Sequence, residues 1–207
     1  LRNVSLEARL GKKSWKEFGE ALFTNQGISG PIVLTLSSLL SGRNLDKLEL
    51  TLDFKPALDT ASLSQRLKRE RKNSPNRSLK TLFASFLPKS IVPVFLDLGE
   101  MDGDKPFHQM TLGEENHFIR LLKSFPLTFA GLEGFNQAVV TRGGVCVKEI
   151  NPSTMESRIC PGLYFAGEIL DVDAMTGGYN LQIAFSTGYL AGLSASQVLA
   201  EKNQEEL

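Results

Sequence analysis

The residues whose types and order suggest chemistry lie between Gly167 and Gln182. The apolar run 163–166 is typical of a short buried strand, and Gly167 and Glu168 follow at its carboxyl end. In open α/β sheets, ligands bind outside the carboxyl ends of the strands. A carboxylate there can accept hydrogen bonds from the hydroxyls of a sugar or a ribityl chain. This order predicts a polar ligand site beginning at residues 167 and 168.

A pair of glycines follows, Gly177 and Gly178, and the pattern becomes helical from Tyr179. Glycines allow a ligand to approach the backbone closely, and the start of a helix offers free N–H groups and partial positive charge. A flavin gains negative charge at its N1/C2=O edge on reduction, so a helix start directed there would stabilise the reduced form. Together these features form half of a flavin site. Taken alone, the glycine pair is better explained by a turn that only packs.

The whole segment 161–182 strongly resembles the C-terminal motif of the BaiN/YhiN-type flavoproteins, which are NAD(P)/FAD-dependent, aminoacetone-oxidase-like oxidoreductases. Two further stretches resemble the same family: residues 22–31 (LFTNQGISGP), and the stretch that runs from VTRGGV at 140–145 through TMES at 154–157. The resemblance covers nearly the entire chain and is weakest over residues 56–126. It implies an enzyme that binds FAD, takes hydride from NADH or NADPH and acts on a small-molecule substrate.

The resemblance also assigns residues to the flavin. Gly167 and Glu168 would face the ribityl and pyrophosphate region, although related flavoproteins usually have Asp at the position of Glu168. Asp171 and Thr176 would shape the loop that follows. The remaining residues would meet the isoalloxazine ring, chiefly through backbone N–H groups: Gly177, Gly178, Tyr179, Asn180, Leu181 and Gln182. No catalytic acid or base stands out.

Arg142 lies beside a second glycine pair, Gly143 and Gly144, in one of the stretches that resemble the family. It would line the substrate side of the flavin, or it would be a surface residue of a turn. Asp171 and Asp173 have no basic partner nearby in sequence, so we expect them to be solvated or to cap the following helix.

The family's full chain begins with a dinucleotide-binding unit that contains Gly-x-Gly-x-x-Gly, a spacing absent from these 207 residues. Without that pyrophosphate cradle, we expect the chain alone to be flavin-free and inactive. The first residue is not Met, and Val4, Leu6 and Ala8 alternate with polar residues as in a half-buried strand. This opening is typical of a fragment of a longer protein.

The elements that must position these residues indicate an α+β fold. Alternation predicts a strand over 48–54, and Pro31 begins a predicted helix over 31–41, capped by Ser29 or Gly30. Further strands are expected at 128–130, 137–141 and 145–150. We therefore expect a β-barrel-like domain (1–55 and 127–150) with an inserted helical bundle (56–126). Residues 151–207 would be the C-terminal part of a Rossmann-like FAD-binding domain, with strand, loop and helix.

Two helices carry specific expectations. Thr111 and Glu114 have the spacing of a capping box at the start of the bundle's last helix. The helix from Tyr179 has small residues that would let it lie close to a sheet. Its predicted apolar face comprises Leu181, Ala184, Phe185, Gly188, Ala191, Gly192, Ala195, Val198 and Leu199.

Composition excludes several classes of protein. The net charge is zero, so no bulk attraction to nucleic acid or anionic membrane is expected, and no apolar run approaches the roughly 20 residues of a membrane helix. Cys146 and Cys160 have apolar neighbours and are expected to be buried free thiols in a reducing compartment, the cytoplasm. His108 and His117 lack acidic ligands at suitable spacing, so no metal site is expected.

A basic cluster stands apart from these features. It comprises Arg66, Lys68, Arg69, Arg71, Lys72, Arg77 and Lys80, opposed only by Glu70. No aromatic residues alternate with it, so a solvated helix face is favoured over a nucleic-acid site. The alternative function is a non-catalytic binding module that recognises a partner through this insert. An upstream Gly-x-Gly-x-x-Gly would favour the enzyme.

Overall fold

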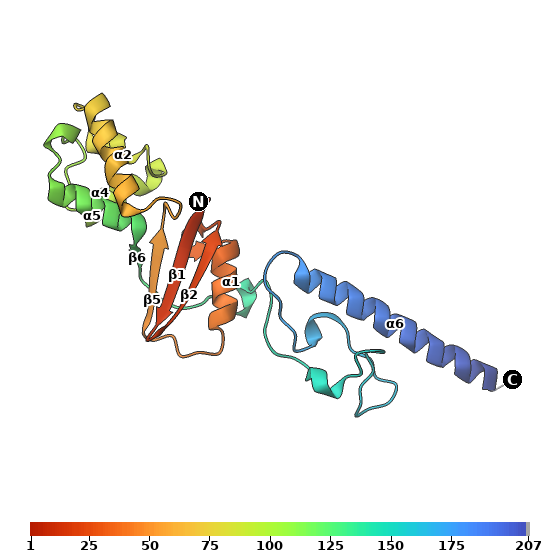
Figure 1. Cartoon of the computed structure of the whole chain (residues 1–207). Coiled ribbons are helices and arrows are strands. Elements are labelled where there is room, and N and C mark those ends of the chain that lie inside the picture. Colours follow the sequence, from red (N-terminus) through yellow and green to blue (C-terminus); the bar gives the residue numbers. More distant parts are fainter. Residues whose placement is uncertain (206–207) are drawn as a thin grey trace. The chain divides into compact units, whose positions relative to one another are not determined.

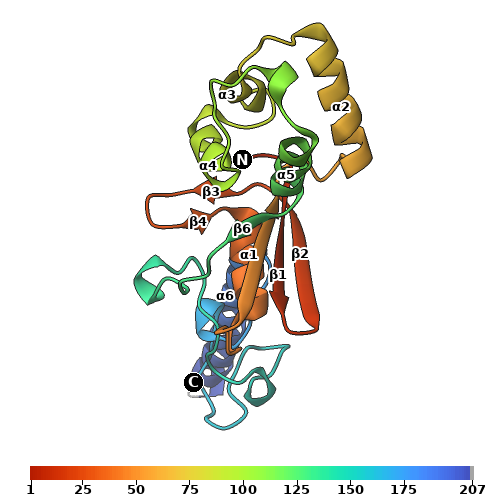
Figure 2. The same cartoon turned by 90° about the vertical axis from the view of Figure 1, so that its left-hand side faces the viewer.

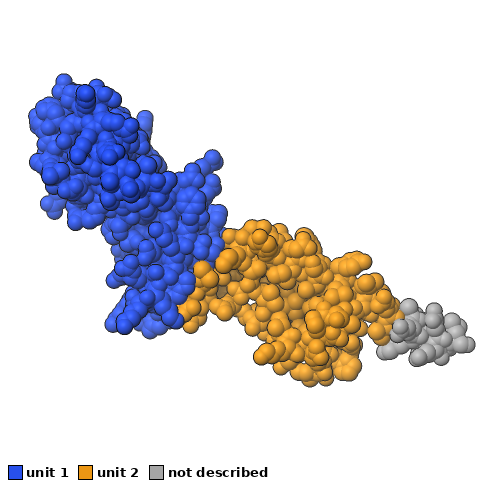
Figure 3. Space-filling model, viewed as in Figure 1, with its two compact units in different colours: residues 1–36, 44–130 blue, residues 37–43, 131–207 orange. Residues whose placement is uncertain are grey.

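The computed structural model describes the backbone of residues 1–205 and the side chains up to residue 198. The chain divides into two compact units, which Figure 3 colours separately. Unit 1 comprises residues 1–36 and 44–130, and unit 2 comprises residues 37–43 and 131–207. The structure combines antiparallel strands with several helices, so the expected α+β class is confirmed at this level.

Unit 1 contains a four-stranded antiparallel sheet in the order β2-β1-β5-β6. The strands are β1 (Val4–Leu10), β2 (Lys13–Gly19), β5 (Leu48–Asp53) and β6 (Phe125–Leu127). In β1 the apolar residues Val4, Leu6 and Ala8 are all buried, as their alternation predicts. Strand β5 also forms where the alternation places it. The sheet is open, with β2 and β6 at its edges.

Before β5, unit 1 also contains a short hairpin and the first part of a helix, up to residue 36 (Figures 1 and 2). Strands β3 (Leu22–Phe23) and β4 (Ile28–Ser29) pair with each other. Helix α1 (Pro31–Leu40) begins at the expected proline, and the N–H groups of Val33 and Leu34 donate to the carbonyl of Gly30. Ile32 and Leu36 are buried, and a Cβ at Gly19 would lie only 2.9 Å from Ile32 Cγ2.

The helical part of unit 1 lies in the chain between β5 and β6, which pair directly with each other. It consists of α2 (Thr60–Asn73), α3 (Leu79–Phe83), η1 (Lys89–Ile91), α4 (Val92–Leu98), η2 (Phe107–Gln109) and α5 (Leu112–Lys123). Figure 2 shows these helices grouped at the end of the sheet. The helices are therefore an insertion between neighbouring strands, while the boundaries at residues 55, 126 and 150 stay predictions.

Phenylalanine rings form the centre of the helical part. Phe83 and Phe118 stack with centroids 3.8 Å apart, and Phe95 stacks on Phe125 of β6 at 5.0 Å. The expected capping box is present: Glu114 N–H donates to Thr111 Oγ1 at 3.2 Å, and Thr111 N–H donates to Glu114 Oε2 at 2.7 Å. Local sequence and packing thus agree on where α5 begins.

Unit 2 has little regular structure apart from one long helix. It contains η3 (Phe135–Gln137), η4 (Val147–Glu149), η5 (Gly167–Ile169) and α6 (Tyr179–Glu205). Its buried cluster is small, comprising Ile150, Met155, Leu170 and Ala191. None of the helices within residues 1–205 is long and apolar enough to cross a membrane.

The strands expected after residue 127 are wrong in this structure. Residues 128–130 follow β6 instead of forming a strand, and η3 and η4 occupy parts of 137–141 and 145–150. The run 163–166 makes a single bridge, Glu156 with Tyr164, and Val145 bridges Leu170. Apolar runs form strands only where a neighbouring segment offers a continuous ladder of hydrogen bonds. In residues 131–205 only isolated bridges occur.

Two burial expectations are also wrong. Leu181, Phe185 and Val198 of the predicted apolar face of α6 are exposed, whereas Ala191 and Ser194 are buried. The side chain of Leu199 lies outside the described residues. Cys146 and Cys160 are free, as expected, but they are exposed. Neither cysteine belongs to the small core of unit 2, although Val145 beside Cys146 packs against it, and of the predicted face of α6 Ala191 is the residue that enters this core.

Candidate functional site

The turn at Gly167 is attached to helix α6. Gly167 begins η5 with φ at 74°, in the left-handed region. Its N–H donates to Thr187 Oγ1 at 2.9 Å, and that hydroxyl donates to the carbonyl of Ile183 at 2.7 Å. A Cβ at Gly167 would lie 3.8 Å from Ala184 Cβ, an ordinary contact. The glycine is therefore required for its backbone conformation, and Thr187 fixes the turn against α6.

Glu168 is held by Thr141, a residue that was not among the predicted site residues. Its Oε1 accepts hydrogen bonds from the N–H of Thr141 at 2.8 Å and from the Thr141 hydroxyl at 3.3 Å. No hydrogen bond to Oε2 is recorded within the described part of the chain. Thr141 lies in the 140–145 stretch that resembles the family, which is the one signal that would have indicated it. The carboxylate is thus oriented and keeps one oxygen for a ligand.

The loop around Gly144 lies directly against the segment that carries Glu168. The N–H of Val145 donates to the carbonyl of Ile169 at 2.8 Å, and the N–H of Asp171 donates to the carbonyl of Val145 at 3.0 Å. A Cβ on Gly144 would collide with the carbonyl oxygen of Ile169 and lie 2.8 Å from the carbonyl carbon of Leu170. Only glycine allows this approach. The backbone of Asp171 is engaged here, and its side chain is exposed.

Arg142 is directed to a carboxylate. Its Nε lies 3.7 Å from Asp173 Oδ1, and Asp173 Oδ2 accepts a hydrogen bond from the Ser38 hydroxyl at 3.2 Å. Asp173 therefore has two partners within unit 2, where the sequence indicated none. The Arg142 side chain is 58% exposed, so the pair is weak by itself. Its role beside the flavin stays a prediction.

The loop that precedes α6 is held to the helix by the side chain of Asn180. Asn180 Oδ1 accepts from the N–H of Ala174 at 2.8 Å, and Asn180 Nδ2 donates to the carbonyl of Ala174 at 2.9 Å. The loop through Thr176 is thereby folded back onto the helix. The N–H of Gln182 donates to the carbonyl of Gly178 at 3.0 Å, which is the first bond of the helical pattern. The side chain of Asn180 is structural, which leaves its backbone N–H for the predicted role.

The glycine pair has the geometry that a ligand at the helix start needs. Gly177 and Gly178 have φ values of 119° and 88°, and a Cβ on Gly178 would meet no protein atom within 4 Å. Tyr179 and Leu181 are 62% and 63% exposed. Because the first N–H groups of a helix lack intrahelical acceptors, this end can donate to an acceptor at the edge of a planar ring. The residues present fit half of a flavin site.

The structure thus collects the ten predicted residues in unit 2, in two groups. Gly167 and Glu168 lie in η5 and Asp171 follows it, while residues 176–182 form the end of the loop and the first residues of α6. Contacts between η5 and α6 connect the two groups. Their contact with a flavin stays a prediction.

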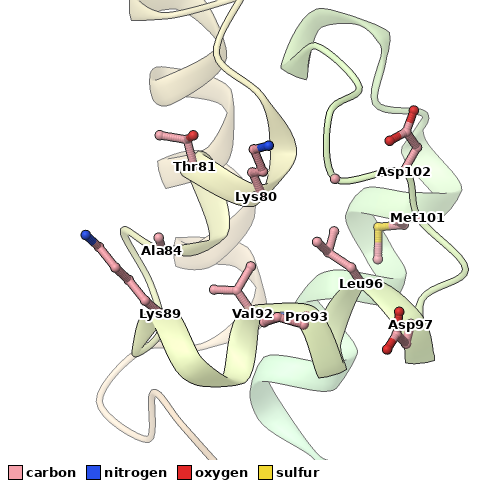
Figure 4. Close-up of a pocket in the computed structure, with 11 residues that line it drawn as sticks. Lys80, Thr81, Ala84, Lys89, Val92, Pro93, Leu96, Asp97, Met101 and Asp102 are labelled. Atoms are coloured by element: carbon pink, nitrogen blue, oxygen red, sulfur yellow. The ribbon is translucent and has the colours of Figure 1, made fainter.

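A surface pocket of about 710 Å³ lies elsewhere, among the helices of unit 1 (Figure 4). Its apolar lining comes from Ala84, Val92, Pro93, Leu96 and Met101. Lysines and aspartates both reach its rim: Lys80, Lys89, Asp97 and Asp102. This mixture of charges indicates no single class of ligand, and none of the predicted site residues lines the pocket.

Comparison with known proteins places the chain in a family. Residues 1–140 match the family described as HI0933-like protein barrel and H2TH domain. The chain belongs to this HI0933-like family, which is of the BaiN/YhiN flavoprotein type, so the resemblance is confirmed.

Three relatives illustrate the range of this family. The chain is 32% identical over 201 residues to a 3-dehydro-bile acid delta(4,6)-reductase of Clostridium scindens, covering 94% of this chain and 48% of the relative. It is 33% identical over 194 residues to a ribosomal RNA dihydrouridine synthase of Haemophilus influenzae, covering 94% and 46%. It is 36% identical over 182 residues to an Escherichia coli protein of the same description, covering 88% and 43%. The chain spans about half the length of these relatives, and the family indicates a flavoprotein-type oxidoreductase.

Proposed function

We propose that this chain is the C-terminal part of an FAD-dependent oxidoreductase that takes hydride from NADH or NADPH and acts in the cytoplasm. The observation that carries the proposal is the open start of α6, where Gly178 leaves space in front of unused helix N–H groups. Family membership and the name of the Clostridium relative support the reaction class. In this proposal η5 and α6 are the part of a Rossmann-like domain that returns after the insertion.

The chain's own residues would orient the cofactor and stabilise its charge. The backbone N–H groups of Tyr179 and Leu181 would donate to the isoalloxazine edge, and Glu168 Oε2 would accept from the ribityl chain. A bound flavin would supply the hydride chemistry. Donors already fixed where negative charge develops need no reorganisation, which is why the start of a rigid helix suits this role.

The exposed side of α6 supports the need for a further domain. Leu181, Phe185 and Tyr189 are 63%, 70% and 74% exposed and lie four residues apart, so they form one stripe. Gly188 and Gly192 lie beside it, with no atom within 4 Å of a Cβ at either position. Contiguous exposed apolar surface marks interaction sites. We assign this stripe to contact with a dinucleotide-binding unit that contains Gly-x-Gly-x-x-Gly.

It follows that the 207-residue chain alone would not retain FAD and would be inactive. The test is a flavin absorbance spectrum of two purified proteins, this chain and the chain extended upstream in its gene. The proposal expects a yellow extended protein beside a colourless short one. An extended protein that is also colourless and fails to bind added FAD would favour the binding-module alternative.

A further inference from the structure

The basic cluster of the helical insert separates into two groups once its contacts are known. Arg66 lies over the Phe86 ring, 4.2 Å from its centroid. Arg71 is paired with the buried Glu115 at 2.9 Å. These two cations face into unit 1 and help to hold α2 against its neighbours.

Two further members of the cluster are also paired. Arg77 lies 3.6 Å from Glu70, and Lys80 is bonded to Asp104. Glu70 is the one acidic residue of α2. Because Arg77 engages it, Glu70 is not left to balance the other cations of its helix.

Three cations remain: Lys68, Arg69 and Lys72, which we call the α2 basic face. All three are exposed, and among residues 1–198 none of them has a recorded ion pair. Their positions i, i+1 and i+4 place them on one side of the helix. Leu63 and Leu67, on the other side, are fully buried. Figure 2 shows α2 at the periphery of the helical group.

The residue types on the α2 basic face fit one class of anionic partner better than the others. A membrane-bound helix needs apolar residues beside its cations, but the apolar side of α2 is inside the protein. Unpaired nucleotides need aromatic side chains to stack on, and α2 has none. The phosphates of base-paired RNA need only suitably spaced cations. Lys68 and Lys72 are separated by about 6 Å along the helix axis.

We propose that the α2 basic face binds the phosphate backbone of base-paired RNA. This deepens the proposed function by naming the surface that an RNA substrate would contact, and it rests on that proposal for the reaction. Two relatives at 33% and 36% identity are described as ribosomal RNA dihydrouridine synthases, so RNA is a substrate within the family. Sequence alone favoured a solvated face, because it could not show which cations are unpaired.

The test compares two triple charge reversals in the 207-residue chain. Lys68→Glu/Arg69→Glu/Lys72→Glu removes the α2 basic face. Lys12→Glu/Lys13→Glu/Lys16→Glu makes the same change in charge at exposed lysines of the β1–β2 hairpin. The probe is a fluorescein-labelled RNA stem-loop, and binding is followed by anisotropy at about 50 and 200 mM salt. Circular dichroism checks that each variant is folded, and a triple Gln variant at 68, 69 and 72 replaces the first if it is not.

The expected size follows from counterion release. Three phosphate contacts on a duplex give a slope of about −2.7 in log K against log salt, or roughly a 40-fold loss of affinity over that range. The α2 variant should lose this salt-dependent part of its RNA affinity, while the hairpin variant should largely keep it. Equal losses in both variants, no RNA binding by the unmodified chain, or binding to anionic vesicles instead of RNA would each overturn the proposal. Since the assay contains no flavin, its result is independent of the flavin spectrum.

Discussion

At Gly144 two backbone segments of the candidate site lie so close together that a single added methyl group would perturb them. In Gly144→Ala the new Cβ would overlap the carbonyl of Ile169 and lie 2.8 Å from the carbonyl carbon of Leu170. Backbone atoms cannot rotate away as a side chain can. The loop must therefore separate from the segment that carries Glu168.

The cost has two parts. A φ of 148° suits glycine, and an L-residue there costs about 1–3 kcal/mol. Separation also breaks the hydrogen bonds Val145 N–H to Ile169 O and Asp171 N–H to Val145 O, worth about 1 kcal/mol each. The sum is about 3–5 kcal/mol.

Gly143→Ala is the matched control. Gly143 also has a positive φ, 101°, but a Cβ there meets nothing within 4 Å. Gly143→Ala should carry only the backbone-strain part of the free-energy cost. The two variants should therefore differ by about 2 kcal/mol, or roughly 30-fold in the equilibrium constant for local opening of the loop. Amide hydrogen exchange at Val145 and Asp171, measured in both variants, reports this directly. Equal exchange rates would refute the close approach.

Three further perturbations concern unit 1. Phe118→Ala should lower the free energy of unfolding in urea by about 3–5 kcal/mol, because Phe118 is fully buried in the aromatic cluster. A decrease of less than about 1 kcal/mol would contradict that packing. Arg71→Met should lower the free energy of unfolding by about 1.5–3 kcal/mol, because it leaves the buried Glu115 without its cation. In the same assay, the double variant Arg71→Met/Glu115→Gln should recover part of that free energy. Partial burial raises the pKa of Glu114, but hydrogen bonds from Lys105 and Thr111 outweigh it and hold the pKa below its usual value. The resulting stability is present above the ordinary glutamate pKa of about 4.3 and is lost as the pH falls through the lowered value. Glu114→Gln should therefore flatten the fall in melting temperature below about pH 4.3, and parallel curves for the two proteins would be the contrary result.

Local patterns predicted most of unit 1. The alternation in β1 and the Thr111–Glu114 capping box depend on neighbours a few residues away, and both occur as expected. The paired or unpaired state of each α2 cation depends instead on residues such as Glu115, far along the chain. That information is absent from the local pattern.

Unit 2 was harder to predict because its contacts are few and non-local. Phe185 was assigned to the packed face of α6, but apolar residues occur all around this helix and its contacts with η5 select another side. The bond from Thr141 to Glu168 spans 27 positions of the chain. Glycine pairs were more informative about the backbone of unit 2. The sequence indicated the Gly143–Gly144 and Gly177–Gly178 pairs, and all four residues have positive φ.

Contact between the start of α6 and the flavin can be tested by one comparison in the upstream-extended protein. Gly178→Ala and Gly162→Ala impose similar backbone strain, since their φ values are 88° and 79° and neither Cβ meets an atom within 4 Å. The measurement is the FAD dissociation constant of each variant, from quenching of flavin fluorescence. We predict that Gly178→Ala weakens FAD binding by at least about tenfold, or about 1.4 kcal/mol, while Gly162→Ala leaves the dissociation constant near that of the unmodified protein. Equal affinities in the two variants would contradict a flavin contact at this helix.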